Sequence, residues 1–355
     1  MLKDLFCAIG LGQGGCKMAK EFYNNKYRSF FINTSYQDLE ALQVENDLIY
    51  HIPASHGCAK NRKRAINYAK NYYETMIGKL LDTHPTARIF LVHFTLGGGT
   101  GGGIANIFMA LLNQILISKN IDDFMIIPIC AKPKKYESYQ MQKNAIDSLQ
   151  EMYKMIDNGV INQYYIINND SRKDFEEINQ ENALLFDRWI EGEESNNNSN
   201  TDESERMDLF SYKGNAIMFE FSGGDIEEFN ENLQMSYNDS IYCKASKKPL
   251  AIGLALNENI NEEKALESIK NTIGYFSNTH ITPTKVSNMI IVSGIADNNS
   301  IANEIINIAN REAELINGEQ EEQEDLVEIE DIKIKEKPKK ENKKMNSLKD
   351  IMDFF

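Results

Sequence analysis

The segment Gly97 to Gly103 constrains this chain more than any other feature, because six of its seven residues are glycine and the remaining one is Thr100. It follows an apolar run that predicts a strand, Arg88 to His93, and opens a helical pattern near Ile104. Glycines let backbone N–H groups approach a ligand closely, and a helix N-terminus adds a positive dipole. The segment therefore predicts an anion-binding loop, although it lacks the Gly-Lys-Ser/Thr ending of a P-loop.

Short aliphatic runs alternate with longer helical patterns in the first half of the chain, which predicts a doubly wound, mostly parallel α/β sheet. Such sheets bind ligands at the carboxyl ends of their strands. The expected strands are Leu5 to Ile9, Ser29 to Ile32, Arg88 to His93, Phe124 to Ile129 and Gln163 to Ile167. The expected helices are Cys16 to Tyr23, Asn61 to Thr83, Gly103 to Ser118 and Tyr136 to Ile156.

The second half begins with a long helix, expected at Phe175 to Glu191, and a polar stretch, Gly192 to Asp202, that predicts a loop or hinge. Further strands and helices suit a smaller α+β domain. The strands are expected at Ala216 to Phe221, Leu250 to Leu256 and Met289 to Val292, and the helices near Glu262 to Thr272 and Ser300 to Ile316. The predicted units are 1–172, a central helix 173–192, a loop 193–206, a second domain 207–317 and a tail 318–355.

Composition narrows the class of protein. The five cysteines are widely spread, without a CxxC pair or a metal-ligand spacing, which predicts neither disulfides nor a zinc site. The first residues show no signal-peptide pattern, and no apolar stretch approaches the roughly 20 residues of a membrane span. We therefore expect a cytoplasmic protein without a membrane partner. The formal net charge of −15 argues against a broad DNA-binding face on the body, so contact with nucleic acid should be indirect.

The tail changes charge along its length. Residues 319–331 hold eight acidic side chains and no basic one, whereas residues 333–349 hold eight lysines against two glutamates. Such composition predicts a disordered segment. The last nine residues restore apolar side chains at helical spacing, with Leu348, Ile351, Met352 and Phe355, so they are expected to form an amphipathic helix on a partner. The alternative is a tail that only confers solubility.

A second glycine turn, Gly10 to Gly15, follows the first strand and precedes a helix. Alone it resembles a weak dinucleotide-binding fingerprint, and a nicotinamide-dependent dehydrogenase or a nucleotide-binding protein that does not polymerise stays an alternative. A dehydrogenase would want an acidic residue at the end of the second strand to hold the ribose. That strand ends in Asn33-Thr34-Ser35 instead.

Together, the two glycine segments resemble the loops of the tubulin and FtsZ GTPases. The signature of that family is GGGTG, then Ser or Thr, then Gly. In this chain Gly102 takes the position of the Ser or Thr, so that one hydroxyl group is missing. The resemblance implies a tubulin-like fold, GTP or GDP as ligand, and Mg²⁺ on the phosphates. It assigns phosphate contacts to four loops. Their residues are Gly12, Gln13, Gly14, Gly15, Cys16, Asn33, Gly57, Ala59, Lys60, Gly97, Gly98, Gly99, Thr100, Gly101 and Gly102.

The same resemblance implies the contacts of the sugar and the base. Glu137, after Pro133, takes the place of the ribose-binding loop, and Met141 or Gln142 replaces the arginine usual there. Asn169 resembles the sixth loop. Asn182 takes the place of the residue that bonds the guanine edge, with Ile178 in place of the aromatic ring.

The segment Asn200 to Glu205 resembles the NxDxxD or NxDxxE loop of the family, which enters the nucleotide site of the next subunit. Carried over, Asp202 and Glu205 position the water that attacks the γ-phosphate, and Asn200 bonds a phosphate. The other interpretation is an ordinary acidic solvent loop, which is common in a chain this acidic.

Within the family, a short divergent chain with a lysine-rich tail resembles the TubZ branch, whose filaments segregate plasmid and prophage DNA. That likeness implies a head-to-tail filament of the chain with itself, and a tail that recruits a DNA-bound adaptor of the TubR type. An FtsZ-like role in cell division is the alternative, since Leu348 to Phe355 faintly resembles the FtsZ tail motif.

Overall fold

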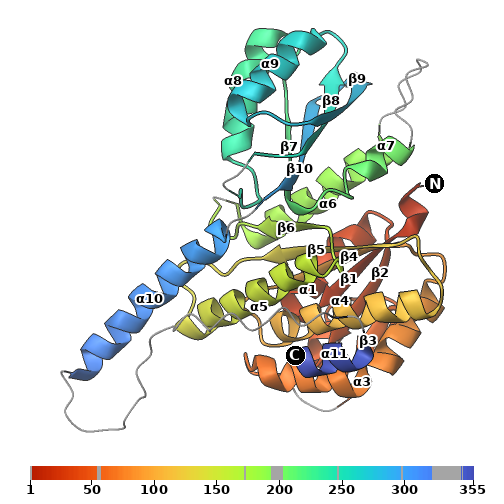
Figure 1. The fold of residues 1–355 in the computed structure, drawn as a ribbon, viewed down its shortest axis with the longest axis vertical. Coiled ribbons are helices and arrows are strands. Elements are labelled where there is room, and N and C mark those ends of the chain that lie inside the picture. The colour runs from red at the N-terminus through yellow and green to blue at the C-terminus, as the bar shows by residue number, and fades with distance from the viewer. Residues whose placement is uncertain are drawn as a thin grey trace.

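A single mixed sheet of ten strands forms the centre of the molecule, in the order β3-β2-β1-β4-β5-β6-β7-β10-β8-β9 (Figure 1). The computed structural model describes residues 2–53, 57–171, 173–192, 203–245, 248–296, 299–321, 345 and 347–355. The fold is α/β, with helices on both faces of the six parallel strands that come first in the chain. This confirms the predicted fold class.

The parallel part of the sheet is buried on both faces except at its edge strand β3, which is half-buried, and such burial requires continuous apolar runs. Its strands are β1 (Phe6–Leu11), β2 (Arg28–Asn33), β3 (Ile49–His51), β4 (Ile89–Thr95), β5 (Met125–Ala131) and β6 (Gln163–Ile167). The helices that accompany them are α1 (Gly12–Asn24), α2 (Tyr36–Glu40), α3 (Arg62–Thr83), α4 (Thr100–Ser118) and α5 (Tyr139–Asp157), with two short 3₁₀ turns at Leu2–Leu5 and Asn46–Leu48. The sequence patterns had predicted neither β3 nor α2.

Two apolar clusters lie on opposite faces of this sheet, because side chains along a strand alternate between its faces. On β1, Phe6 and Ala8 belong to the cluster that includes α1 and α6 (Phe175–Glu191). Cys7 and Ile9 belong to the cluster that includes α3, α4 and α5. Helices therefore cover both faces of the sheet, and the carboxyl ends of the strands are not covered by either layer.

The last four strands continue the same sheet, since β6 pairs in parallel with β7 (Gly214–Phe221) at Gln163 and Gly214. β10 (Asn288–Ile295) then pairs antiparallel with both β7 and β8 (Ala251–Asn257), and β9 (Asn278–Thr284) closes the edge. The helices of this half are α7 (Glu203–Asp208), α8 (Ile226–Asn238) and α9 (Glu262–Thr272). The chain then forms α10 (Ser300–Glu321), which runs beyond the predicted end at Ile316, and α11 (Leu348–Phe354).

α4 is the one helix of the described residues that is long and apolar enough to cross a membrane. Of the apolar stretch of this helix, 72% is buried inside the protein. The apolar content of α4 is therefore explained by its position in the core, between α3 and α5.

Candidate nucleotide-binding site

A cavity of about 540 Å³ lies where the parallel strands end, with residues that follow β1, β2, β4, β5 and β6 around it. Its size is that of a small-molecule site. Most of the residues predicted to bind nucleotide line it together. They are Gln13, Gly14, Asn33, Gly57, Ala59, Lys60, Gly97, Gly98, Gly99, Thr100, Gly101, Glu137 and Asn169.

The two glycine loops touch each other backbone to backbone. Gly12 has a φ of 71°, and a Cβ atom built on it would lie 2.7 Å from the amide nitrogen of Gly101. A Cβ atom on Gly101 would in turn lie 2.6 Å from the carbonyl oxygen of Leu11. Side chains are excluded at this contact, so the two loops pack directly against each other beside the cavity.

α4 begins at Thr100, earlier than the sequence pattern indicated, so the last residues of the glycine segment form its first turn. The N–H groups of a first turn have no acceptor within their own helix, and the helix dipole makes this end positive. Gly99, Thr100 and Gly101 line the cavity. The start of α4 is thus built to receive an anion such as a phosphate.

A hydrogen-bond network fixes the loop after β2. Asn33 donates from Nδ2 to Asp38 (3.1 Å), and Gln13 donates to the other oxygen of Asp38 (3.4 Å). The hydroxyl groups of Thr34 and Thr100 are 2.9 Å apart, which links this loop to the start of α4. Asp38 and Thr34 both line the cavity and were missed by the sequence analysis, although Asp38 lies only five residues beyond Asn33.

The loop before α3 approaches the glycine segment from the other side. Ala59 and Lys60 have φ angles of 45° and 61°, a left-handed conformation that non-glycine residues seldom adopt and that often accompanies a binding site. A Cβ atom on Gly99 would lie 2.5 Å from the Cα atom of Lys60. Asn144 of α5 donates to the carbonyl oxygens of Lys60 (3.0 Å) and Gly97 (3.1 Å), so one buried amide holds both loops.

Three lysines, Lys17, Lys60 and Lys132, line this cavity in a protein whose net charge is −15. Lys132 is buried, with a side chain only 4% exposed. Burial lowers the pKa of Lys132, but the neighbouring Cys243 sulfur and the carboxylates of Glu304 and Asp170 outweigh it and leave that pKa raised. The lining thus combines three lysines with two carboxylates, those of Asp38 and Glu137.

The ribose-side loop keeps Glu137 at the cavity, where its carboxylate accepts from the amide of Lys134 (2.8 Å). Of the two residues that replace the family's arginine, Met141 lines the cavity. Gln142 is buried and donates to the carbonyl oxygen of Lys134 (2.7 Å). Asn169 donates to the carbonyl oxygen of Lys132 (2.9 Å), which joins the β5 and β6 loops.

At the start of α6, the residues that line the cavity lie about one helical turn before the two that were predicted. Asn182 is fully buried, and its Oδ1 accepts from the hydroxyl of Tyr242 (2.6 Å), while Ile178 is in the core. Phe175 and Asn179 line the cavity instead. These two residues are four apart, so they stack on one face of the helix. An aromatic ring followed by an amide is the pair that the resemblance requires, and this spacing was available in the sequence.

Besides Asn182, four predicted contact residues do not line the cavity and have packing roles. Gly12 and Gly15 allow close approach, because a Cβ atom on Gly15 would lie 2.1 Å from the carbonyl oxygen of His93. Gly102 presents its carbonyl oxygen to Arg62 Nε (2.9 Å). Cys16 is buried, and burial raises the pKa of its thiol, which donates to the carbonyl oxygen of Gly10. These positions pack within and between the loops.

The predicted hydrolytic residues lie away from the cavity or outside the described residues. Asn200 and Asp202 fall in 193–202, which the structure does not describe. Glu205 is exposed on α7, beside the far end of α6, where Trp189 donates to the carbonyl oxygen of Arg206 (3.4 Å). α6 starts at the cavity with Phe175 and is 17 residues long, or about 25 Å at 1.5 Å per residue. Glu205 therefore lies beside the opposite end of α6 from its own cavity.

The described residues contain no group of three or more His, Cys, Asp or Glu side chains arranged to hold a metal ion. Mg²⁺ commonly uses one or two protein ligands and takes the rest from phosphates and water. At the cavity, Asp38 and the Thr100 hydroxyl are oxygen donors of the kind that Mg²⁺ accepts. The side chains present thus fit an ion that arrives with the nucleotide.

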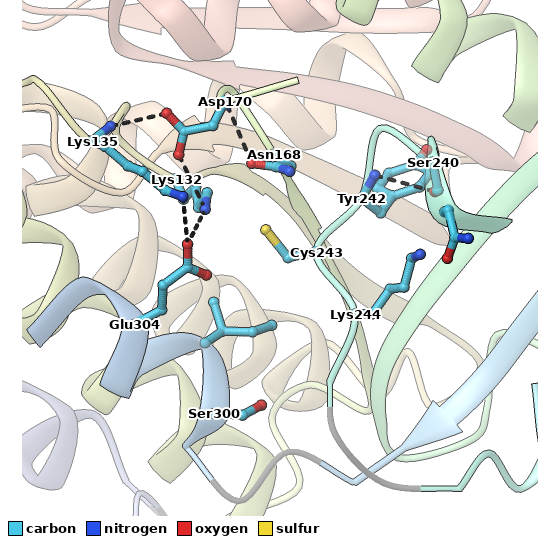
Figure 2. Close-up of a pocket in the computed structure, with 12 residues that line it drawn as sticks. Lys132, Lys135, Asn168, Asp170, Ser240, Tyr242, Cys243, Lys244, Ser300 and Glu304 are labelled. Carbon is cyan, nitrogen blue, oxygen red and sulfur yellow. Dashed lines mark hydrogen bonds and ion pairs between the residues drawn. The ribbon is translucent and has the colours of Figure 1, made fainter. Parts of the chain in front are cut away.

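A second cavity, of about 330 Å³, lies behind Lys132 (Figure 2). The ammonium group of Lys132 is 3.2 Å from Asp170 and 3.0 Å from Glu304 of α10. The backbone amide of Lys135 donates to Asp170 (3.0 Å). This cluster ties the loops after β5 and β6 to the first turns of α10.

Comparison with known proteins adds to this geometry. Residues 6–173 match the Tubulin/FtsZ family, GTPase domain. A tubulin-like protein TubZ from Clostridium botulinum C phage is 28% identical over 294 residues, which cover 82% of this chain and 79% of that protein. The solved structure of tail-truncated TubZ from Clostridium botulinum phage c-st has a TM-score of 0.78 at 25% identity, covering 89% of this chain and 100% of that one. A GTPγS-form protofilament of Bacillus thuringiensis serovar israelensis TubZ has a TM-score of 0.72 at 16% identity, covering 90% and 94%.

Proposed function

The chain carries a GTPase domain of the tubulin/FtsZ family in a tubulin-like fold, and from this premise we propose that it forms filaments whose active sites are completed between adjacent copies. One observation carries the proposal. α6 separates the cavity from α7, which carries Glu205, by about 25 Å, and this supports a role for Glu205 at the cavity of another copy rather than at its own.

In this proposal the phosphates of GTP bind at the start of α4, between the loops that carry Gly14, Lys60 and Gly99. The guanine lies at the start of α6, with Phe175 against its face and Asn179 at its edge. An amide side chain both donates and accepts hydrogen bonds, as the guanine edge requires. Mg²⁺ neutralises charge on the phosphates.

Hydrolysis then uses Asp202 and Glu205 from the next copy in the filament. A carboxylate orients the attacking water or takes its proton, and Asn200 bonds the phosphate. Because a chain alone holds only half of this arrangement, GTP turnover depends on assembly. The protofilament form of the Bacillus thuringiensis relative supports self-association.

We also assign the tail to recruitment. Residues 333–355 combine a lysine-rich run with an apolar terminus on an otherwise acidic chain, which fits a DNA-bound adaptor of the TubR type rather than DNA bound by the body. The protein would act in the cytoplasm, as part of a system that segregates plasmid or prophage DNA. The phage origin of the TubZ relatives supports this assignment.

A mixing experiment tests completion between copies. Asp202→Ala keeps the cavity but removes the carboxylate, whereas Gly99→Val keeps the carboxylate but drives a side chain into Lys60 and blocks the phosphates. Each variant alone should hydrolyse GTP at least tenfold more slowly than wild type. A mixture of the two should regain turnover, because intact halves then meet at one interface. A mixture no faster than the separate variants, with both folded by circular dichroism, would contradict the proposal.

A further inference from the structure

The C-terminal helix α11 lies on the GTPase domain of its own chain, not away from it (Figure 1). It packs against α4, and its neighbours include α3 and the end of α5. The amphipathic face that sequence analysis reserved for a partner is therefore already occupied within the monomer.

Apolar contacts form the centre of this interface. Ile351 is 1% exposed and Met345 is 5% exposed, and both belong to the same buried cluster as the apolar residues of α3, α4 and α5. The remaining apolar side chains of the segment are partly buried against that cluster. They are Leu348, Met352, Phe354 and Phe355.

Polar contacts fix the direction of the helix. Ser347 caps its start by accepting from the amide of Asp350 (3.2 Å). At its other end, Lys70 of α3 donates to the carbonyl oxygen of Met352 (2.6 Å), where a helix presents free carbonyls and negative dipole. Lys154 of α5 lies over the ring of Phe354, 5.2 Å from its centre.

The helix is short, and this makes its docking reversible. Seven residues do not form a stable helix in water on their own, so α11 depends on the surface beneath it. One side chain of the helix, Ile351, is almost fully buried against that surface, and its other apolar side chains are only partly buried there. The covalent connection to α10 keeps α11 close, at an effective concentration on the order of millimolar for a linked ligand.

We propose that α11 is a releasable internal ligand of a docking surface formed by α3, α4 and α5, and that release exposes the apolar face with which the tail binds its partner. While α11 is docked, Ile351, Met352 and Phe355 contact the docking surface and are not available to a partner. The docking surface itself is independent of the proposed function, whereas the role of release in partner binding rests on it.

A labelled peptide of residues 345–355 tests the docking surface in full-length protein. Ile351→Asp in the protein removes the anchor of its own α11 and frees the surface, so we expect the wild-type peptide to bind this variant at least tenfold more tightly than it binds wild-type protein. Asp353→Asn, at an exposed position of the same helix, is the matched control and should behave as wild type. Fluorescence anisotropy gives the affinities without GTP, filaments or adaptor.

Two further measurements sharpen the result. A peptide carrying Ile351→Asp should bind none of the proteins, and adding Lys70→Met to the Ile351→Asp protein should weaken binding of the wild-type peptide severalfold. Equal peptide affinity for wild-type and Ile351→Asp protein would overturn the proposal. Because this assay uses neither nucleotide nor partner, its failure would leave the GTPase assignment intact, and failure of the GTPase assignment would leave the docking result standing.

Discussion

At the scale of single residues, Asn179 and Asn182 show how three positions on one helix separate a ligand contact from a core contact. Asn179 lines the cavity beside Phe175. Asn182 is fully buried and accepts from the hydroxyl of Tyr242, whose own burial raises its pKa well above the usual value. The first amide is free to meet a base, and the second satisfies a buried phenol.

Matched alanine substitutions should separate these roles. Asn179→Ala should weaken GTP binding by about tenfold, as expected for about 1.4 kcal/mol of hydrogen bonding to the base, and should reduce discrimination against ATP. Asn182→Ala should lower the free energy of unfolding by about 1–3 kcal/mol, because it leaves the Tyr242 hydroxyl unpaired in the core. Calorimetric titration and urea unfolding measure the two effects. The opposite pattern would return the base contact to Asn182.

His93 gives the fold a pH dependence that is unrelated to the nucleotide. It is fully buried on β4, with its ring 4.6 Å from that of Phe22, and burial lowers its pKa from 6.5 to about 3. Below pH 6.5, His93 takes up a proton in the unfolded chain but stays neutral in the folded chain. Folding should therefore lose roughly 1.4 kcal/mol per pH unit from about pH 6 down towards pH 3.

The substitution His93→Phe should flatten this part of the stability profile, since phenylalanine cannot take up the proton. Urea unfolding at a series of pH values measures the slope. An unchanged slope in His93→Phe would mean that other groups cause the acid sensitivity.

At the scale of elements, the sequence predicted what local patterns determine. The strands are continuous apolar runs, and the glycine segments mark the turns that follow them, so β1, β4 and their loops were found. The bounds of α6 were predicted as observed, but its cavity-lining residues were not, because Asn179 and Asn182 both fit a helical pattern. Its start is set by a capping box between Asp174 and Glu177, which places Phe175 in the first turn at the cavity.

Tertiary contacts explain the other differences. Asn144 holds the Lys60 and Gly97 loops together from α5, more than forty residues along the chain from each, and no local pattern shows this. The position of α11 likewise depends on a surface formed by α3, α4 and α5. An amphipathic segment indicates that an apolar surface covers it, but the sequence does not tell whether that surface is its own chain or another.

At the scale of the whole molecule, the two halves of the proposed active site lie at opposite ends of α6. Under the proposed function, turnover would then depend on the filament, and the outer faces of the helices would be left for other contacts. Those faces belong to a chain with a formal net charge of −15, whereas residues 333–349 concentrate eight lysines. Positive and negative charges are thus separated along the chain. In the proposed function, an acidic or DNA-bearing partner complex is attracted by the lysine run and repelled by the acidic remainder.

This segregation predicts how salt affects recruitment. Replacing Lys337, Lys339, Lys340, Lys343 and Lys344 with glutamine should lower capture of a DNA-bound adaptor about tenfold at about 50 mM salt. At about 300 mM salt the same change should matter less than twofold, because screening already weakens contacts between exposed charges. GTP turnover should stay at the wild-type level, since the change is confined to the tail.

The acidic half of the same tail supplies the control. Replacing Glu322, Glu324, Glu328 and Glu330 with glutamine removes a similar number of charges, and it should leave capture unchanged or strengthen it, because like charges then no longer oppose the partner. Co-sedimentation of adaptor and DNA with filaments measures both variants. Equal losses from both would show that the tail acts through its length or composition. A loss of capture in the lysine variant alone, which becomes smaller at high salt, would show that recruitment depends on the positive charge of the tail.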